Sequence, residues 1–383
     1  MVIIKKVSAK ETFDSRHEKT ISITINTNVG NFSASSPNGK SKGKHEAKPY
    51  KKDLKEDIEA IKKFSNYFLE ENMENFDDLR KIEDIIDGFI GANTLFAFQS
   101  TVLKALAHKQ KKEVWQLINT NSKKFPRLLG NVIGGGKHSH GKKPDFQEFL
   151  LAPNLNSVKE NFELSKKIKK ELENVLKDND GKFDSKKTDE DAWRTELNEK
   201  EVLEVLKKIK IPIGVDVAAS SFCKRKKYNY ENPMLKRTEE EQLLYLTNLI
   251  KNFNMFYIED PFNENDFESF SKLLKKFPDK LIVGDDLTVT NTTRLKKAIE
   301  IKSINGIIVK PNQTGSLLEV KEVCDLAKKN NIKIIFSHRS GETEENILAD
   351  LAFGFGADFI KTGITGKGRE SKIKRLIEIE NKG

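Results

Sequence analysis

The sequence predicts an α/β protein in which a small α+β unit precedes a barrel of alternating strands and helices. Short apolar runs recur in the last half of the chain, and the polar residues that follow them are spaced 24 to 27 residues apart after a first interval of 43. The 259 residues after position 124 match the roughly 250 residues of an eight-stranded parallel barrel. An open doubly wound sheet is the alternative, but it does not need a charged residue after so many strands.

The composition excludes several classes of protein. The 383 residues are 37% hydrophobic and 33% charged, which is typical of a globular chain and not of a disordered or collagen-like one. The apolar runs are far shorter than the roughly 20 residues that span a bilayer, and the first residues lack the pattern of a signal peptide. We therefore expect a cytoplasmic protein that contacts no membrane.

The net charge of +10 attracts anions in general and selects none of them. The lysines lie beside glutamates and aspartates in helical segments, which is typical of a solvated face, so nucleic acid is not expected as a partner. The two cysteines, Cys223 and Cys324, form no metal or redox motif, and we expect both to be buried as apolar side chains.

The N-terminal elements follow from periodicity. Alternating isoleucines at 21–25, turn residues at 28–31 and a second run at 32–34 predict a hairpin. Helical spacing of apolar residues predicts helices over 53–71 and 93–108.

A polar stretch at 119–124 ends this pattern and places a domain boundary there. The expected domains are an α+β unit at 1–124 and a barrel domain at 125–383. The barrel strands are expected at the apolar runs 211–215, 255–258, 281–283, 306–309, 332–336 and 358–360.

Three carboxylates follow successive strands: Asp216, Glu259 and Asp285. The carboxyl ends of barrel strands meet at one mouth, so these side chains should converge there. A set of oxygen ligands without cysteine suits Mg²⁺. Each carboxylate alone could instead cap the helix that follows it.

Lys310 and Lys361 follow two further strands and should enter the same mouth. Neighbouring positive charge would lower the pKa of a lysine and permit a neutral amine that acts as a base. The alternative is that the two lysines neutralise the carboxylates and stay protonated.

Arg339 and Ser340 follow another strand and could hold a phosphate or carboxylate, unless Arg339 pairs with Glu342 or Glu344. Glu148 and Glu190 are ordinary as isolated residues. The glycine-rich stretches at 39–41 and 134–136 fail the nucleotide-loop patterns and are interpreted as hinges of mobile loops.

Longer motifs follow one another along the chain: Phe13-Asp-Ser-Arg16, Gly91-Ala-Asn93, Gln147-Glu-Phe149, Asp216-Val-Ala-Ala-Ser220, Ile258-Glu-Asp-Pro-Phe262, Gly284-Asp-Asp-Leu287, Ser337-His-Arg-Ser-Gly341 and Lys361-Thr-Gly363. In this order they resemble the enolase family over essentially the whole chain. The resemblance implies an N-terminal α+β capping domain on a modified (β/α)8 barrel. It also implies the Mg²⁺-dependent, reversible dehydration of 2-phosphoglycerate to phosphoenolpyruvate by a homodimer.

By the same resemblance, Asp216, Glu259 and Asp285 are the ligands of a first Mg²⁺, Lys310 is the base and Glu190 is the acid. A lysine base with Mg²⁺ is the known pattern of this superfamily. The resemblance also implies which residues contact the substrate or support such a contact: Gln147, Glu148, His138 and Lys361, of which Glu148 and His138 count as catalytic. It implies that Arg339 and Ser340 hold the phosphate. Ser41 is implied as a ligand of a second, substrate-dependent Mg²⁺.

Two loops depart from the family pattern. Lys40 and Lys42 replace small neutral residues, and Asp191-Ala-Trp193 replaces Gly-Gly-Phe after Glu190. Two other functions therefore stay open: a paralogue that acts on another phosphorylated or carboxylated hydroxy acid, and a non-catalytic binder of anions or RNA.

Overall fold

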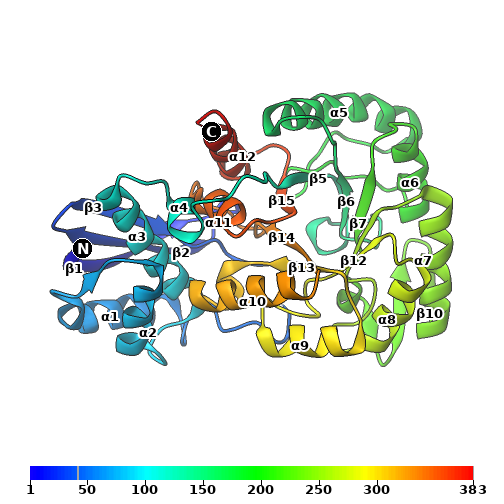
Figure 1. Cartoon of the computed structure of the whole chain (residues 1–383). Helices are drawn as coiled ribbons and strands as arrows, with labels where there is room; N and C mark the ends of the chain where they lie inside the picture. The colour runs from blue at the N-terminus through cyan, green and yellow to red at the C-terminus, as the bar shows by residue number, and fades with distance from the viewer. Residues whose placement is uncertain (41–42, 383) are drawn as a thin grey trace.

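The computed structural model describes residues 1–40 and 43–382, which form two parts that pack side by side (Figure 1). The N-terminal part holds an antiparallel sheet in the strand order β3-β2-β1-β4. Its elements are β1 (Val2–Phe13), β2 (Lys19–Thr27), β3 (Gly30–Ser35), α1 (Leu54–Phe64), β4 (Asn72–Met73), α2 (Arg80–Ile86) and α3 (Ala92–Gln110).

The expected hairpin is present as β2 and β3, which pair antiparallel through the register of Ile23 with Ala34. The three isoleucines of β2 are buried, because alternate side chains of a strand face the same side of the sheet. The first helix is shorter than expected: α1 ends at Phe64 and continues as a single 3₁₀ turn at Ser65–Phe68, where the Ser65 amide bonds the Lys62 carbonyl.

Helix α3 joins the two parts. Most of its side chains are buried, and it lies on β2 and β3 with its first turn against the 3₁₀ turn Pro311–Gln313 of the barrel. There Asn312 Nδ2 donates to Asn93 Oδ1 over 2.9 Å. The helix therefore fixes the N-terminal part against the barrel.

The second part is a closed barrel in the order β11-β12-β13-β14-β15-β5-β6-β7. The strands are β5 (Arg127–Gly134), β6 (Glu148–Leu151), β7 (Ile213–Asp216), β11 (Tyr257–Glu259), β12 (Leu281–Gly284), β13 (Gly306–Val309), β14 (Lys333–Ser337) and β15 (Phe359–Gly363). The six apolar runs are confirmed as strands. The expected modified barrel is confirmed. It departs from the all-parallel arrangement that the spacing alone predicts, because β6 runs antiparallel to both β5 and β7.

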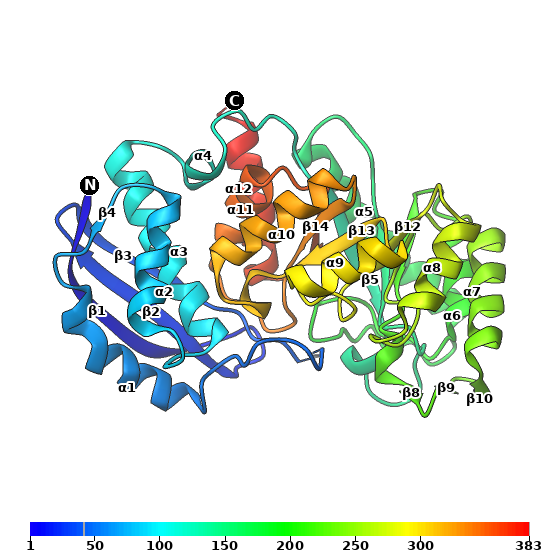
Figure 2. The ribbon, with the colours of Figure 1, turned by 60° about the horizontal axis from the view of Figure 1, so that its bottom comes forward.

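Helices surround the barrel, and α10, α11 and α12 face the N-terminal part (Figure 2). The helices are α4 (Val114–Ile118), α5 (Val158–Asn179), α6 (Glu199–Lys207), α7 (Glu239–Phe253), α8 (Phe267–Lys276), α9 (Thr292–Ile301), α10 (Leu317–Lys329), α11 (Ile347–Gly354) and α12 (Lys367–Glu380). A small sheet of β8 (Cys223–Lys224), β9 (Lys227–Glu231) and β10 (Met234–Arg237) precedes α7.

The barrel interior is filled by inward side chains, which include Leu129, Leu150, Tyr257, Val283 and Ile308, all fully buried. This packing closes the barrel below its mouth, so the polar side chains at the carboxyl strand ends sit on a solid base.

Two smaller points complete the fold. No helix in the described part of the chain is long and apolar enough to cross a membrane. Cys324 is buried as expected, whereas Cys223 is only partly buried, because it lies in the peripheral strand β8.

Candidate active site

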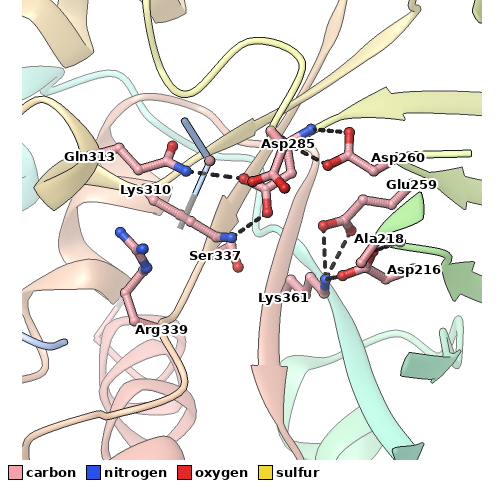
Figure 3. A network of polar contacts seen from close by, with 12 residues as sticks. Asp216, Ala218, Glu259, Asp260, Asp285, Lys310, Gln313, Ser337, Arg339 and Lys361 are labelled. Atoms are coloured by element: carbon pink, nitrogen blue, oxygen red, sulfur yellow. Dashed lines mark hydrogen bonds and ion pairs between the residues drawn. The ribbon is translucent and has the colours of Figure 1, made fainter. Parts of the chain in front are cut away.

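The carboxyl ends of the barrel strands bring charged side chains to one mouth (Figure 3). Asp216 and Glu259 end neighbouring strands β7 and β11 and lie opposite each other in the parallel register. Asp285 and Lys310 directly follow β12 and β13, and Lys361 lies in β15. The closed barrel and the loops over its mouth bury Asp216, Glu259, Asp285 and Lys361, whereas Lys310 is partly buried.

Lys361 is the central cation of this group. Its Nζ lies 2.9 Å from Asp216 Oδ2, 2.9 Å from each carboxylate oxygen of Glu259 and 3.4 Å from Glu148 Oε2. Burial would lower the pKa of Lys361, but the surrounding carboxylates raise it well above its ordinary value. Lys361 is therefore a fixed positive charge.

Lys310 makes a short ion pair with Asp285 Oδ2, and Gln313 Nε2 donates to the other oxygen of Asp285 over 3.1 Å. Of the two alternatives that the sequence left open for Lys310, its surroundings favour the protonated amine that neutralises a carboxylate. Burial does lower the pKa of Lys310, but Asp285 raises it by more, so the pKa lies above its ordinary value.

Two aspartates that the sequence analysis passed over complete the acidic side of the mouth. Asp260 accepts hydrogen bonds from the amides of Asp285 and Asp286, and carboxylate oxygens of these three residues lie within 4.8 Å of one another. The signal was available, since each follows directly after a predicted ligand in the sequence.

The donor set of the mouth fits a divalent cation. Burial and mutual repulsion raise the pKa values of Glu259 and Asp260 well above the ordinary range, and burial with Asp285 raises that of Asp286 to about 7. A cation bound here would offset the repulsion between these buried carboxylates and lower their pKa values. Asp216 and Glu259 meet at Lys361, while Asp285 lies with Asp260 and Asp286, so the predicted ligands belong to two adjoining groups.

A second cluster joins His138, Glu148 and Glu190, whose ligand atoms lie within 4.8 Å of one another. His138 Nδ1 is 2.8 Å from Asp189 Oδ1 and its Nε2 is 3.6 Å from Glu190 Oε1. His338, which the site prediction missed, lies 3.8 Å from the other oxygen of Glu190.

The two carboxyl groups of this cluster differ in protonation. Burial raises the pKa of Glu148 to about 8. Burial also acts to raise the pKa of Glu190, but His138, His338 and Arg369 outweigh it and lower the pKa below its ordinary range. His138 itself has a pKa of about 9, since the acidic neighbours outweigh its burial. At neutral pH the pair therefore holds a proton on Glu148 and a charge on Glu190.

Arg339 faces the loop from the N-terminal part. Its Nη2 lies 2.9 Å from Glu46 Oε2, and its Nη1 donates to Asn312 Oδ1 over 3.0 Å. The alternative pairing with Glu342 is not the one observed, because Glu342 accepts from the Arg339 backbone amide and pairs with Lys372 at 2.6 Å. A Cβ at Gly39 would lie 1.9 Å from Arg339 Nη2, so a larger residue here would have to displace this guanidinium.

One pocket brings together most of the predicted site residues. Those that line it are His138, Gln147, Glu148, Glu190, Asp216, Asp285, Lys310, Arg339, Ser340 and Lys361. Within the described ranges, the buried Gln147 Oε1 meets no hydrogen-bond partner, which leaves an acceptor for a ligand. Ser41, the predicted ligand of a second cation, lies outside the described residues.

Fold and site together define a barrel enzyme that handles an anionic substrate with buried carboxylates and lysines. A family model for the enolase C-terminal TIM barrel domain matches residues 122–382. The chain is 36% identical to the enolase of Pyrobaculum aerophilum over 94% of this chain and 91% of that protein. It is 37% identical to the enolase of Sulfurisphaera tokodaii over 99% of this chain and 95% of that protein. The chain belongs to the enolase family.

Proposed function

We infer that the chain carries out the reaction of its family, the reversible dehydration of 2-phosphoglycerate to phosphoenolpyruvate, as a hydro-lyase that uses a divalent metal. One observation carries this inference beyond family membership: Lys310 and Lys361 meet the carboxylates of Asp216, Glu259 and Asp285 at one barrel mouth. Proton removal beside a carboxylate needs a base and fixed positive charge at the same place.

We propose that Asp216, Glu259 and Asp285 hold a first Mg²⁺ and that Ser41 contributes to a second, which depends on substrate. The gathering of carboxylate oxygens at the mouth, described above, supports the first site. When bound, Mg²⁺ supplies positive charge against the negative charge that develops on the substrate carboxylate.

Lys310 is the base in this proposal. Burial, Arg339 and Lys361 all act to lower its pKa, whereas Asp285 and, by a smaller amount, Glu259 raise it. Once the Asp285 carboxylate is engaged elsewhere, the remaining surroundings favour the neutral amine. Lys310 can then accept the proton from the substrate carbon.

The acid is the pair of Glu190 and Glu148. Glu190 is charged in the free protein, so it must receive a proton before it can protonate the leaving hydroxide. Glu148, with its raised pKa, is the neighbouring group that holds one. His138 lies near both carboxyl groups, 3.6 Å from Glu190 Oε1, and its other ring nitrogen pairs with Asp189.

Arg339 and Ser340 hold the phosphate, with Gln147 and Lys361 as further contacts of the substrate. Arg339 already carries an anion in the free protein, the Glu46 carboxylate at 2.9 Å. A phosphate with more negative charge would compete for the same guanidinium.

The test is an absorbance assay for phosphoenolpyruvate from 2-phosphoglycerate, with Mg²⁺ and then with excess chelator. We expect turnover that the chelator abolishes and that added Mg²⁺ restores. Folded protein without turnover on 2-phosphoglycerate, but with turnover on another phosphorylated hydroxy acid, would contradict the inference and favour a paralogue.

Three organisational points stay predictions. They are the domain division at residue 124, the cytoplasmic location and the homodimer. Light scattering tests the last of these: a dimer has twice the 43.7 kDa mass of the chain.

A further inference from the structure

The segment that carries Glu190 has a backbone that most residues avoid. Asp191 has a φ of 62°, in the left-handed region that favours glycine. The turn is closed by hydrogen bonds from the Asp191 amide to the Thr188 carbonyl over 3.0 Å and from the Thr188 amide to the Ala192 carbonyl over 2.8 Å. Asp191 is therefore a strained residue next to the proposed acid, and contacts with other elements must stabilise its conformation.

Two side chains from other elements, Lys169 and Thr365, meet the carboxylate of Asp191, and Lys187 of the same segment pairs with it at 3.2 Å. Lys169, from the middle of α5, is 4% exposed, and its Nζ donates to Asp191 Oδ2 over 2.8 Å. The same Nζ makes short contacts with the Asp191 carbonyl and the Thr365 hydroxyl, and that hydroxyl also contacts the Asp191 carboxylate. Thr365 follows β15, four positions after Lys361.

The arrangement depends on Asp191. A buried ammonium is costly without a counter-charge, and burial indeed lowers the pKa of Lys169 while the hydrogen bond with Asp191 opposes that shift. The Lys169 carbonyl also accepts from Trp193 Nε1 over 2.8 Å, so α5 grips the turn on both sides of Ala192.

Glu190 faces the other way. Its carboxylate accepts from Asn131 Nδ2 over 3.2 Å and lies beside His138 and His338 in the pocket. The adjacent residues 190 and 191 thus point to opposite sides, one to the reacting group and one to α5. A shift of Asp191 must move Glu190.

We propose that Lys169, Asp191 and Thr365 form a clamp that positions Glu190 before substrate binds. None of the three is placed in contact with substrate, so they are positioning residues. The inference rests on the proposed role of Glu190 as part of the acid pair. Holding a catalytic group in place beforehand matters because a displacement of about 1 Å can cost about a hundredfold in rate.

The test uses Lys169→Met, Asp191→Gly and the double variant, each as the full chain. Glycine accepts the φ of 62°, so Asp191→Gly keeps the turn without the ion pair. We expect each single variant to lower kcat about 10- to 100-fold with KM within about twofold. The double variant should lose no more than either single one, because residues that act as one unit are non-additive. Amide hydrogen exchange at residues 188–193 of the substrate-free protein should become faster in all three.

The control is Lys177→Met, which removes an exposed partner of Glu173 on the same helix at 3.0 Å and should change nothing. Variants with a lower melting temperature but wild-type kcat and loop exchange would overturn the clamp, as would additive losses in the double variant. Glu190→Gln is run alongside. If it keeps full activity, the proposed role of Glu190 fails, and the exchange data still decide whether the clamp holds the turn.

Discussion

Lys361 shows how one residue can hold a site together. It is 2% exposed and faces Asp216, Glu259 and Glu148 within 3.4 Å. Removing one partner of a buried ionic group leaves an uncompensated charge in the interior. The resulting loss of stability is larger than the stability that the intact pair contributes.

Lys361→Met should therefore lower the free energy of unfolding of the metal-free protein by about 3–5 kcal/mol. Urea denaturation measures it, and Mg²⁺ should restore part of the loss, because a ligand of the native state stabilises that state. Lys367→Met is the matched control, since its pair with Glu344 is exposed. A loss below about 1 kcal/mol would show that the carboxylates do not depend on Lys361.

The residue scale is also where sequence reasoning reached its limit. The spacing of Asp216, Glu259 and Asp285 after apolar runs was enough to predict that they converge. The protonation of Lys310 was not predictable, because it depends on which carboxylate comes nearest in space. The partner of Arg339 is Glu46, 293 positions away, and no local pattern links the two.

At the scale of elements, Arg375 links α12 to two other segments of the chain. Arg375 pairs with Asp350 of α11 at 2.8 Å and with Glu113, the residue before α4, at 2.6 Å. Asp350 is 2% exposed, so it depends on this partner.

Arg375→Met should lower the free energy of unfolding by about 3 kcal/mol, since Asp350 would remain buried without a cation. Chemical denaturation is again the measurement. Lys374→Met on the same helix breaks only an exposed pair with Glu370 and should cost less than about 0.5 kcal/mol. Equal losses in the two variants would contradict the account.

Helices and strands were predictable where the apolar residues recur with a clear period. They were not predictable where tertiary structure overrides the local sequence pattern. Six of the eight barrel strands were predicted from their apolar runs, because buried parallel strands are apolar along their length. Strands β5 and β6 were not predicted, and the antiparallel direction of β6 was missed with them.

At the scale of the whole molecule, stability should depend on pH through Glu199. Burial raises the pKa of Glu199 to about 7, above its ordinary value near 4.3. The folded state therefore binds the proton more tightly than the unfolded state. The resulting contribution to stability is fully present below about pH 4.3 and is lost as the pH rises through 7.

Glu199→Gln keeps an acceptor for Tyr245, whose hydroxyl donates to Glu199 over 2.8 Å, and removes the titration. At pH 8 the variant should be more stable than the wild type by on the order of 3 kcal/mol, and at pH 4 the two should be alike. Urea denaturation across this range measures the difference. A constant difference at all pH values would rule out Glu199 as the cause.

In the site as a whole, Lys310 takes the proton from the substrate carbon, and the pair of Glu190 and Glu148 protonates the leaving hydroxide. The most direct measurement follows exchange of that carbon-bound hydrogen of 2-phosphoglycerate with solvent deuterium by NMR, beside phosphoenolpyruvate formation. We predict that Lys310→Ala loses both by about 100-fold or more, whereas Glu190→Gln loses phosphoenolpyruvate formation but keeps exchange. Exchange at the wild-type rate in Lys310→Ala would contradict the account.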